Sequence, residues 1–146
     1  MIYMLPLYNN LPLYLRNKLH KILMKSARSA IGNYCYKKST SYILNKCKWL
    51  NINNMIKYSS INLLHNILNK NEPKIIINML KINRRSVVDI NTKYIPQSRE
   101  LKSFFIYKSL KLYNAIPKEL KHLETNKFKK ALKKYIENVQ VSDTYD

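Results

Sequence analysis

Glycine is nearly absent from this chain of 146 residues, in which it occurs once, at Gly32. A loop that binds the phosphates of a nucleotide needs several glycines, because the backbone must approach the phosphates closely. Such a loop is therefore excluded. Acidic residues are also scarce, eight against 27 Lys and Arg, and no two of them form a close pair suited to a divalent metal ion. We therefore predict no catalytic residues, no metal and no cofactor.

Cysteine and histidine are equally sparse. Cys35 and Cys47 lack the spacing of a Cys-x-x-Cys pair, so the sequence predicts neither a zinc site nor a disulfide framework. The three histidines, His20, His65 and His122, are far apart, and each lies within a helical pattern. We interpret them as surface or partly buried helix residues.

Long apolar runs are missing as well. None reaches the roughly 18 uncharged residues that a membrane-spanning helix needs, so we predict no transmembrane segment. The apolar fraction of 46% is nevertheless typical of a globular protein, and the length suits one domain. We assign residues 1–10 as the remnant of an upstream segment, because they lack the basic leader and cleavage site of a signal peptide. Residues 11–139 are expected to form a single helical domain, and residues 140–146 a polar tail.

The formal net charge is +19. A surface this basic attracts polyanions, with nucleic acid the first candidate and an anionic membrane surface the second. A second explanation stays open. Asn, Lys, Ile and Tyr make up almost half of the chain, and AT-rich coding DNA favours these residues. Part of the lysine excess can therefore reflect mutational drift.

Helical patterns cover most of the sequence. Pro12 opens the first helix and Gly32 closes it, and further helices are predicted from Ser39 to Cys47, over residues 51–69 and from Pro73. Near residues 82–99 the helical period fails, which predicts an irregular arm or a short hairpin. The predicted fold is mainly α, a small bundle of about five to six helices.

A corner at Tyr113–Pro117 joins two basic helical segments. Pro117 cannot continue the first helix, and Phe128, Leu132 and Ile136 then form the apolar stripe of the second. Trp49 is interpreted as a core residue between helices, with exposed base stacking as the alternative. The predicted core residues are Trp49, Leu50, Tyr113, Pro117, Phe128 and Leu132.

From Leu11 to about Ile136 the order of these elements resembles the region beyond the polymerase core of reverse transcriptases from jockey-like non-LTR retrotransposons. That family has a Trp-Leu-Pro-type element heading a long helix and a Trp-Asn-Ser-Leu-Pro-type turn. Here Asn51 replaces the first proline, and Tyr113 replaces the tryptophan of the turn. The matching segments are residues 25–32, 49–52 with 55–58, 66–69 with Pro73, Arg84-Arg85-Ser86 with Arg99, 113–117 and 128–132.

The resemblance implies descent from an RNA-directed DNA polymerase, whose paired catalytic aspartates are absent here. We therefore expect a noncatalytic region that binds the backbone of RNA or DNA, with an upstream polymerase core as a further candidate partner and no small-molecule substrate. The alternatives are a non-functional relic of a decayed element and a basic protein on anionic membranes. Phosphate contact requires clustered cations, although a solvated helix face is the alternative for each. The candidates are Arg84, Arg85 and Arg99 in the arm, and Lys129, Lys130, Lys133 and Lys134 in the last helix.

Overall fold

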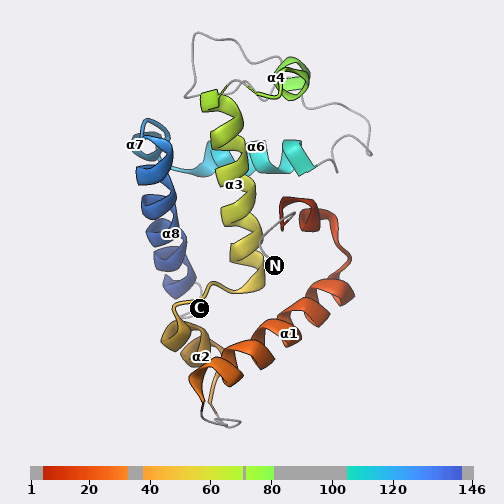
Figure 1. The fold of residues 1–146 in the computed structure, drawn as a ribbon, viewed down its shortest axis with the longest axis vertical. Helices are drawn as coiled ribbons and strands as arrows, with labels where there is room; N and C mark the ends of the chain where they lie inside the picture. The colour runs from red at the N-terminus through yellow and green to blue at the C-terminus, as the bar shows by residue number, and fades with distance from the viewer. Residues whose placement is uncertain (1–4, 33–37, 71, 81–104, 143–146) are drawn as a thin grey trace. The chain divides into compact units, whose positions relative to one another are not determined.

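The computed structural model of the chain describes residues 5–32, 38–70, 72–80 and 105–142. These residues form seven α-helices and one 3-10 helix and contain no strand, so the predicted mainly helical fold is confirmed (Figure 1). The predicted arm near residues 82–99 lies outside this part of the chain. The elements are η1 (Leu5–Asn10), α1 (Leu13–Ile31), α2 (Thr40–Cys47), α3 (Ile52–Lys70), α4 (Lys74–Leu80), α6 (Phe105–Ala115), α7 (Lys118–Lys121) and α8 (Thr125–Ser142).

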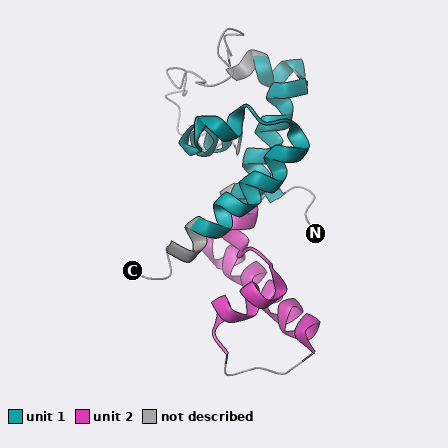
Figure 2. Cartoon of the chain, turned by 90° about the vertical axis from the view of Figure 1, so that its left-hand side faces the viewer, with its two compact units in different colours: residues 1–10, 56–146 teal, residues 11–55 magenta. Residues whose placement is uncertain are grey.

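The chain divides into two compact units (Figure 2). Unit 1 comprises residues 1–10 and 56–146, and unit 2 comprises residues 11–55. The boundary falls in the first turns of α3, between Met55 and Ile56. The single domain predicted for residues 11–139 thus contains all of unit 2 and most of unit 1. Within unit 1, η1 packs against α6, so the segment interpreted as an N-terminal remnant contributes the buried side chain of Leu5.

The helix ends of unit 2 follow from local backbone chemistry. Pro12 precedes α1, and Gly32 closes it at φ +70°, donating its backbone N–H to the carbonyl of Ser29. The hydroxyl of Ser39 accepts the backbone N–H of Tyr42 at 3.3 Å, which caps α2. These are the stop and start positions that the sequence predicts.

Helices α1 and α2 pack against each other. The thiol of Cys47 lies 3.5 Å from the carbonyl oxygen of Ala27, with the geometry of a weak hydrogen bond from α2 to α1. Apolar burial supplies the larger stabilisation of this pair. The buried side chains of the two helices are Leu23, Met24, Ala27, Ile43 and Leu44.

In unit 1 the apolar faces of α3, α6 and α8 are buried. The predicted corner is more elaborate than two helices, because Pro117 precedes the short helix α7 before α8 begins. Proline has no N–H to donate and favours the start of a helix, which explains the break after Ala115. The buried apolar side chains are Ile56, Ile61, Leu64 and Ile67 of α3, Ile106, Leu110 and Tyr113 of α6, Ile116, and Phe128, Leu132 and Ile136 of α8.

Candidate nucleic-acid interface

Helix α8 separates its apolar and cationic residues cleanly. Phe128 and Leu132 are fully buried and Ile136 is 5% exposed, and these residues recur at every fourth position. This spacing places them along one side of the helix. The lysines between them therefore lie on the remaining surface of α8.

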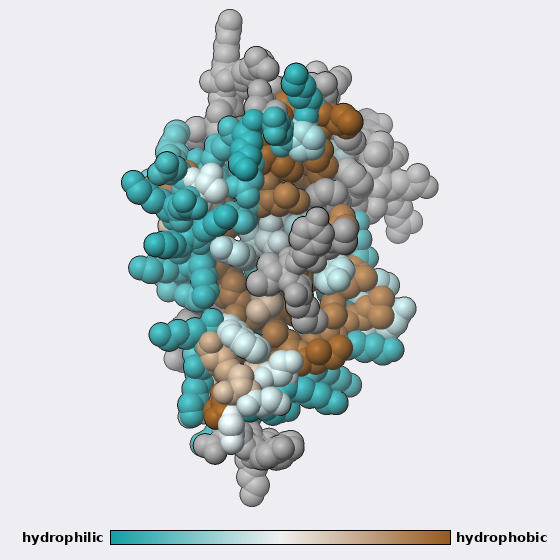
Figure 3. Space-filling view, viewed as in Figure 1, coloured by the Kyte–Doolittle hydropathy of each residue, from teal (hydrophilic) through white to brown (hydrophobic). Residues whose placement is uncertain are grey.

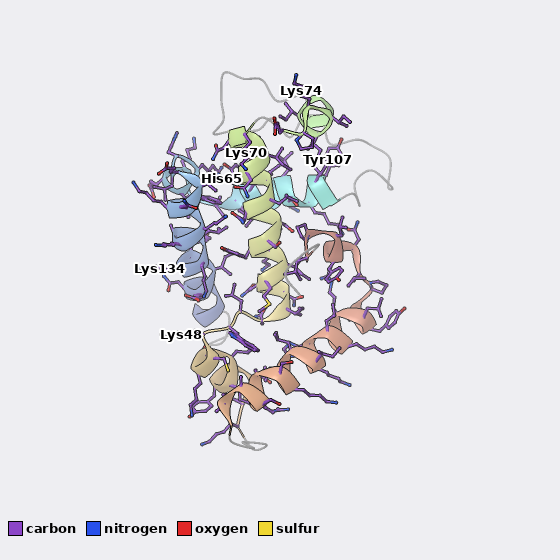
Figure 4. The ribbon with its side chains drawn as sticks, viewed as in Figure 1. Lys48, His65, Lys70, Lys74, Tyr107 and Lys134 are labelled. Carbon is purple, nitrogen blue, oxygen red and sulfur yellow. The ribbon has the colours of Figure 1, made fainter. Side chains whose placement is uncertain are left out.

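Three lysines of α8 form one exposed stripe. Lys127, Lys130 and Lys134 recur at i, i+3 and i+7 and all are exposed. Figure 4 shows Lys134 on the side of α8 away from α3, and Figure 3 shows hydrophilic residues over this part of unit 1. The stripe spans about 10 Å along the helix axis. We call Lys127, Lys130 and Lys134 the α8 stripe. Lys127 was not among the predicted contacts.

The other two predicted lysines lie elsewhere on α8. Lys129 is half-buried, and Lys133 is exposed. Lys133 Nζ lies 3.7 Å from the carboxylate of Glu137, four residues further along the helix. At 100° per residue, Lys133 lies about 60–120° and Lys129 about 100–160° around the helix from the members of the α8 stripe. The four predicted lysines thus divide into two pairs, Lys130 with Lys134 and Lys129 with Lys133.

Arg84, Arg85 and Arg99 fall outside the described residues. The predicted joint surface of arm arginines and helix lysines is therefore represented here by α8 alone.

The predicted core residues differ in burial. Leu50 is 5% exposed, and Tyr113, Phe128 and Leu132 are fully buried. Trp49 and Pro117 are half-buried. Tyr113 thus fills the interior of unit 1 at the corner.

The burial of His65 differs from the prediction. The sequence predicted surface or partly buried histidines, but the side chain of His65 has no exposure to solvent. Its ring stacks on Phe128 at a centroid distance of 3.6 Å and an angle of 12° between the ring planes. This contact joins α3 to the buried side of α8. His122 is exposed and His20 is half-buried, as predicted.

The ring nitrogens of His65 have three polar neighbours. Nδ1 lies 3.2 Å from the hydroxyl of Tyr113, and Nε2 lies 3.1 Å from the carbonyl of Leu123 and 2.9 Å from Nδ2 of Asn69. A ring with its proton on Nε2 donates to Leu123 and accepts from Tyr113. The other tautomer accepts from Asn69 and donates to Tyr113. Either neutral form is hydrogen-bonded in this interior.

Burial shifts the titration of both partners. It lowers the pKa of His65 below 6.5, and the hydrogen bond to the Leu123 carbonyl offsets only part of this effect. Burial also raises the pKa of Tyr113 to about 12. Both side chains are therefore neutral at pH 7.

Lys121 of α7 completes this interior cluster. It is only 4% exposed, and its ammonium lies 5.4 Å from the centroid of the Tyr113 ring. It also donates a hydrogen bond to the carbonyl of Asn114 at 3.4 Å. Lys121 is therefore held at the corner and does not belong to the exposed cationic surface.

Unit 2 is cationic without any counter-charge of its own. No Asp or Glu occurs between residues 11 and 55, and the first acidic residue of the chain is Glu72. Ion pairs inside unit 2 are therefore impossible for its side chains. Its basic residues are Arg16, Lys18, Lys21, Lys25, Arg28, Lys37, Lys38, Lys46 and Lys48.

Two further properties concern metals and membranes. Within the described ranges, no three His, Cys, Asp or Glu side chains gather as a metal site requires. In the same part of the chain, no helix combines the length and hydropathy needed to cross a membrane.

Comparison with protein families, curated proteins and solved structures finds no match to this chain.

Proposed function

We propose that this chain is a noncatalytic nucleic-acid-binding region that contacts the phosphate backbone of RNA or DNA through the α8 stripe. The proposal rests on the arrangement of apolar and cationic residues on α8. Its apolar side is anchored in unit 1 by Phe128 and Leu132, while Lys127, Lys130 and Lys134 are exposed together. A fixed helix holds its cations in register, and clustered lysines release counterions when they neutralise phosphates.

The proposal includes an origin. The order of the corner, the Trp49-Leu50 element and the basic last helix resembles the region beyond the polymerase core of non-LTR retrotransposon reverse transcriptases. In this proposal the chain descends from such an enzyme and has kept the ability to hold nucleic acid. It carries out no polymerisation by itself.

The test is a titration of the whole chain against labelled RNA and DNA at several salt concentrations. Replacing the α8 stripe by K127Q/K130Q/K134Q removes three candidate phosphate contacts. We expect weaker binding and a slope of log K against log salt that is shallower by about 2 for single strands, at 0.7 per contact. Lys57, Lys74 and Lys111 are exposed lysines on α3, α4 and α6, and K57Q/K74Q/K111Q is the charge-matched control. Equal slopes for the two triple variants would contradict the proposal.

A binding assay with vesicles that contain anionic lipid belongs beside this titration. If the chain binds such vesicles and neither RNA nor DNA at low salt, a membrane surface replaces nucleic acid as its partner. If a soluble, cooperatively folded chain binds neither polyanion, the interpretation as a non-functional relic replaces the proposal.

A further inference from the structure

A second cationic surface lies on α1, in unit 2. Tyr14, Lys18, Lys21, Lys25 and Arg28 recur at i, i+4, i+7, i+11 and i+14. This spacing places them on one side of the helix, along about 21 Å of its length. Tyr14 and the three lysines are exposed, and Arg28 is half-buried. Figure 3 shows hydrophilic residues along this helix. We call these five residues the α1 stripe.

The α1 stripe has no compensating charge nearby in its own unit. Like charges three or four residues apart on a helix destabilise it, and carboxylates usually relieve this repulsion. Unit 2 contains no carboxylate side chain. The charge of this surface is complementary to that of a polyanion, which favours a polyanion as the class of partner.

Exposed aromatic rings among the cations favour one class of polyanion, single-stranded nucleic acid. Tyr14 is 62% exposed and has the ammonium of Lys18 at 6.0 Å from its ring centroid. Tyr42 of α2 is 47% exposed and has the ammonium of Lys38 at 5.5 Å. A cation covers one face of a ring and leaves the other available for stacking. Surfaces that bind single-stranded nucleic acid combine cations along the backbone with aromatic rings on which bases stack.

A lipid surface fits α1 less well. An interfacial helix inserts one continuous apolar side between lipids. The side of α1 that carries Leu23, Met24 and Ala27 is already buried. The exposed apolar residues, Leu13, Tyr14 and Ile22, are separated by about 80–180° around the helix and form no stripe.

From this geometry we infer that the α1 stripe is a binding surface for single-stranded nucleic acid. Lys18, Lys21 and Lys25 contact successive phosphates, and Tyr14 stacks on an unpaired base. The inference rests on the proposed function for its partner class, but it concerns a different unit and different residues. Duplexes bind this surface more weakly, because their base faces are covered by neighbouring bases.

The experiment measures fluorescence anisotropy of the full chain with a single-stranded oligonucleotide and with a duplex of the same length, over a series of salt concentrations. K18Q/K21Q/K25Q is expected to weaken single-strand binding and to make its salt slope shallower by about 2. The charge-matched K57Q/K74Q/K111Q variant keeps the slope of the parent chain. Because all six lysines are exposed, circular dichroism of both variants should match that of the parent.

The aromatic contribution has its own pair of variants. Tyr14→Leu removes the stacking ring and is expected to weaken single-strand binding by about 5- to 100-fold, whereas Tyr14→Phe stays within about twofold. Duplex binding changes little in either variant. Equal losses for both substitutions, or none for either, would overturn the stacking role.

The two proposals fail in different ways. If K18Q/K21Q/K25Q behaves like its control while K127Q/K130Q/K134Q loses binding, the inference about α1 is wrong and the proposed function stands. If only the α1 variant loses binding, the α8 stripe is not the contact. A competition assay with anionic vesicles tests the membrane alternative. If vesicles displace the single strand from the parent chain but not from K18Q/K21Q/K25Q, the α1 stripe binds membranes and the inference is overturned.

Discussion

The imidazole of His65 stacks on the ring of Phe128, with 3.6 Å between the ring centroids. His65 lies in the C-terminal half of α3, and Phe128 lies on the buried side of α8. Because the α8 stripe is on the same helix as Phe128, this interior contact fixes the position of the exposed lysines. Stability at this contact and presentation of charge are therefore linked in unit 1.

Removing the Phe128 ring should destabilise the protein strongly. Phe128→Ala deletes a fully buried aromatic side chain and the partner of His65, and we expect a loss of about 3–5 kcal/mol in the free energy of unfolding. Urea denaturation followed by circular dichroism measures it. Lys130→Ala on the exposed side of the same helix should change stability by less than about 0.5 kcal/mol. A similar midpoint for both variants would show that the stack does not anchor α8.

Acid should weaken the fold through His65. The pKa of His65 is lowered in the folded chain, so the unfolded chain binds the proton more readily. Stability is then complete above pH 6.5 and falls as the pH drops from 6.5 toward the lower folded value. Urea midpoints measured between pH 7.5 and 5 test this expectation.

Two histidine variants provide the comparison for this pH series. His65→Gln keeps a polar side chain that does not titrate, so its stability at pH 7 is lower but its midpoint varies less with pH. His122→Gln alters an exposed histidine and should keep the acid dependence of the parent chain. An unchanged pH dependence in His65→Gln would assign the effect to other groups.

The buried hydroxyl of Tyr113 should contribute to stability through its hydrogen bond with His65. Tyr113→Phe leaves the ring in place but removes the partner of His65 Nδ1 at 3.2 Å. A buried nitrogen left without a partner costs about 1–3 kcal/mol. Thermal unfolding of this variant can be compared with Tyr107→Phe, which alters a half-buried tyrosine on the same helix. If both variants unfold at the same temperature, the hydrogen bond contributes little.

Gly32 should be the most sensitive position at the end of α1. Its φ of +70° is unfavourable for residues with a Cβ, and an added Cβ would meet no atom within 4 Å. Gly32→Ala is therefore expected to cost about 1–2 kcal/mol from backbone strain alone. Ser26→Ala, at an exposed position inside α1, should be neutral or slightly stabilising. Fluorescence of Trp49, the single tryptophan of the chain, reports unfolding of unit 2 for both variants.

The helices were predictable because their ends depend on single residues. Pro12, Gly32, Ser39 and Pro73 begin or end helices through local hydrogen bonding and fixed dihedral angles, and α1, α2 and α4 follow these positions. The short helix α7 was missed, because four residues carry too little periodicity to separate them from α8.

The interior of unit 1 could not be predicted in the same way. Both Tyr113 and Leu123 contact His65 from distant parts of the sequence, 48 and 58 residues away. No local pattern marks such a cluster. The α1 stripe was visible in the sequence as the polar side of a helix. Only the extent of unit 2 showed that this unit contains no carboxylate side chain of its own.

The absence of carboxylates from unit 2 also determines whether pH or ionic strength would control its binding to a polyanion. Lysine and arginine side chains carry their charge throughout the physiological pH range, and unit 2 contains no carboxylate side chain. Acid and base therefore cannot release a polyanion from it. Ionic strength can, because dissolved ions compete directly with phosphates. We therefore expect salt to control polyanion binding by unit 2 more strongly than pH, whereas the stability of unit 1 depends on pH through His65.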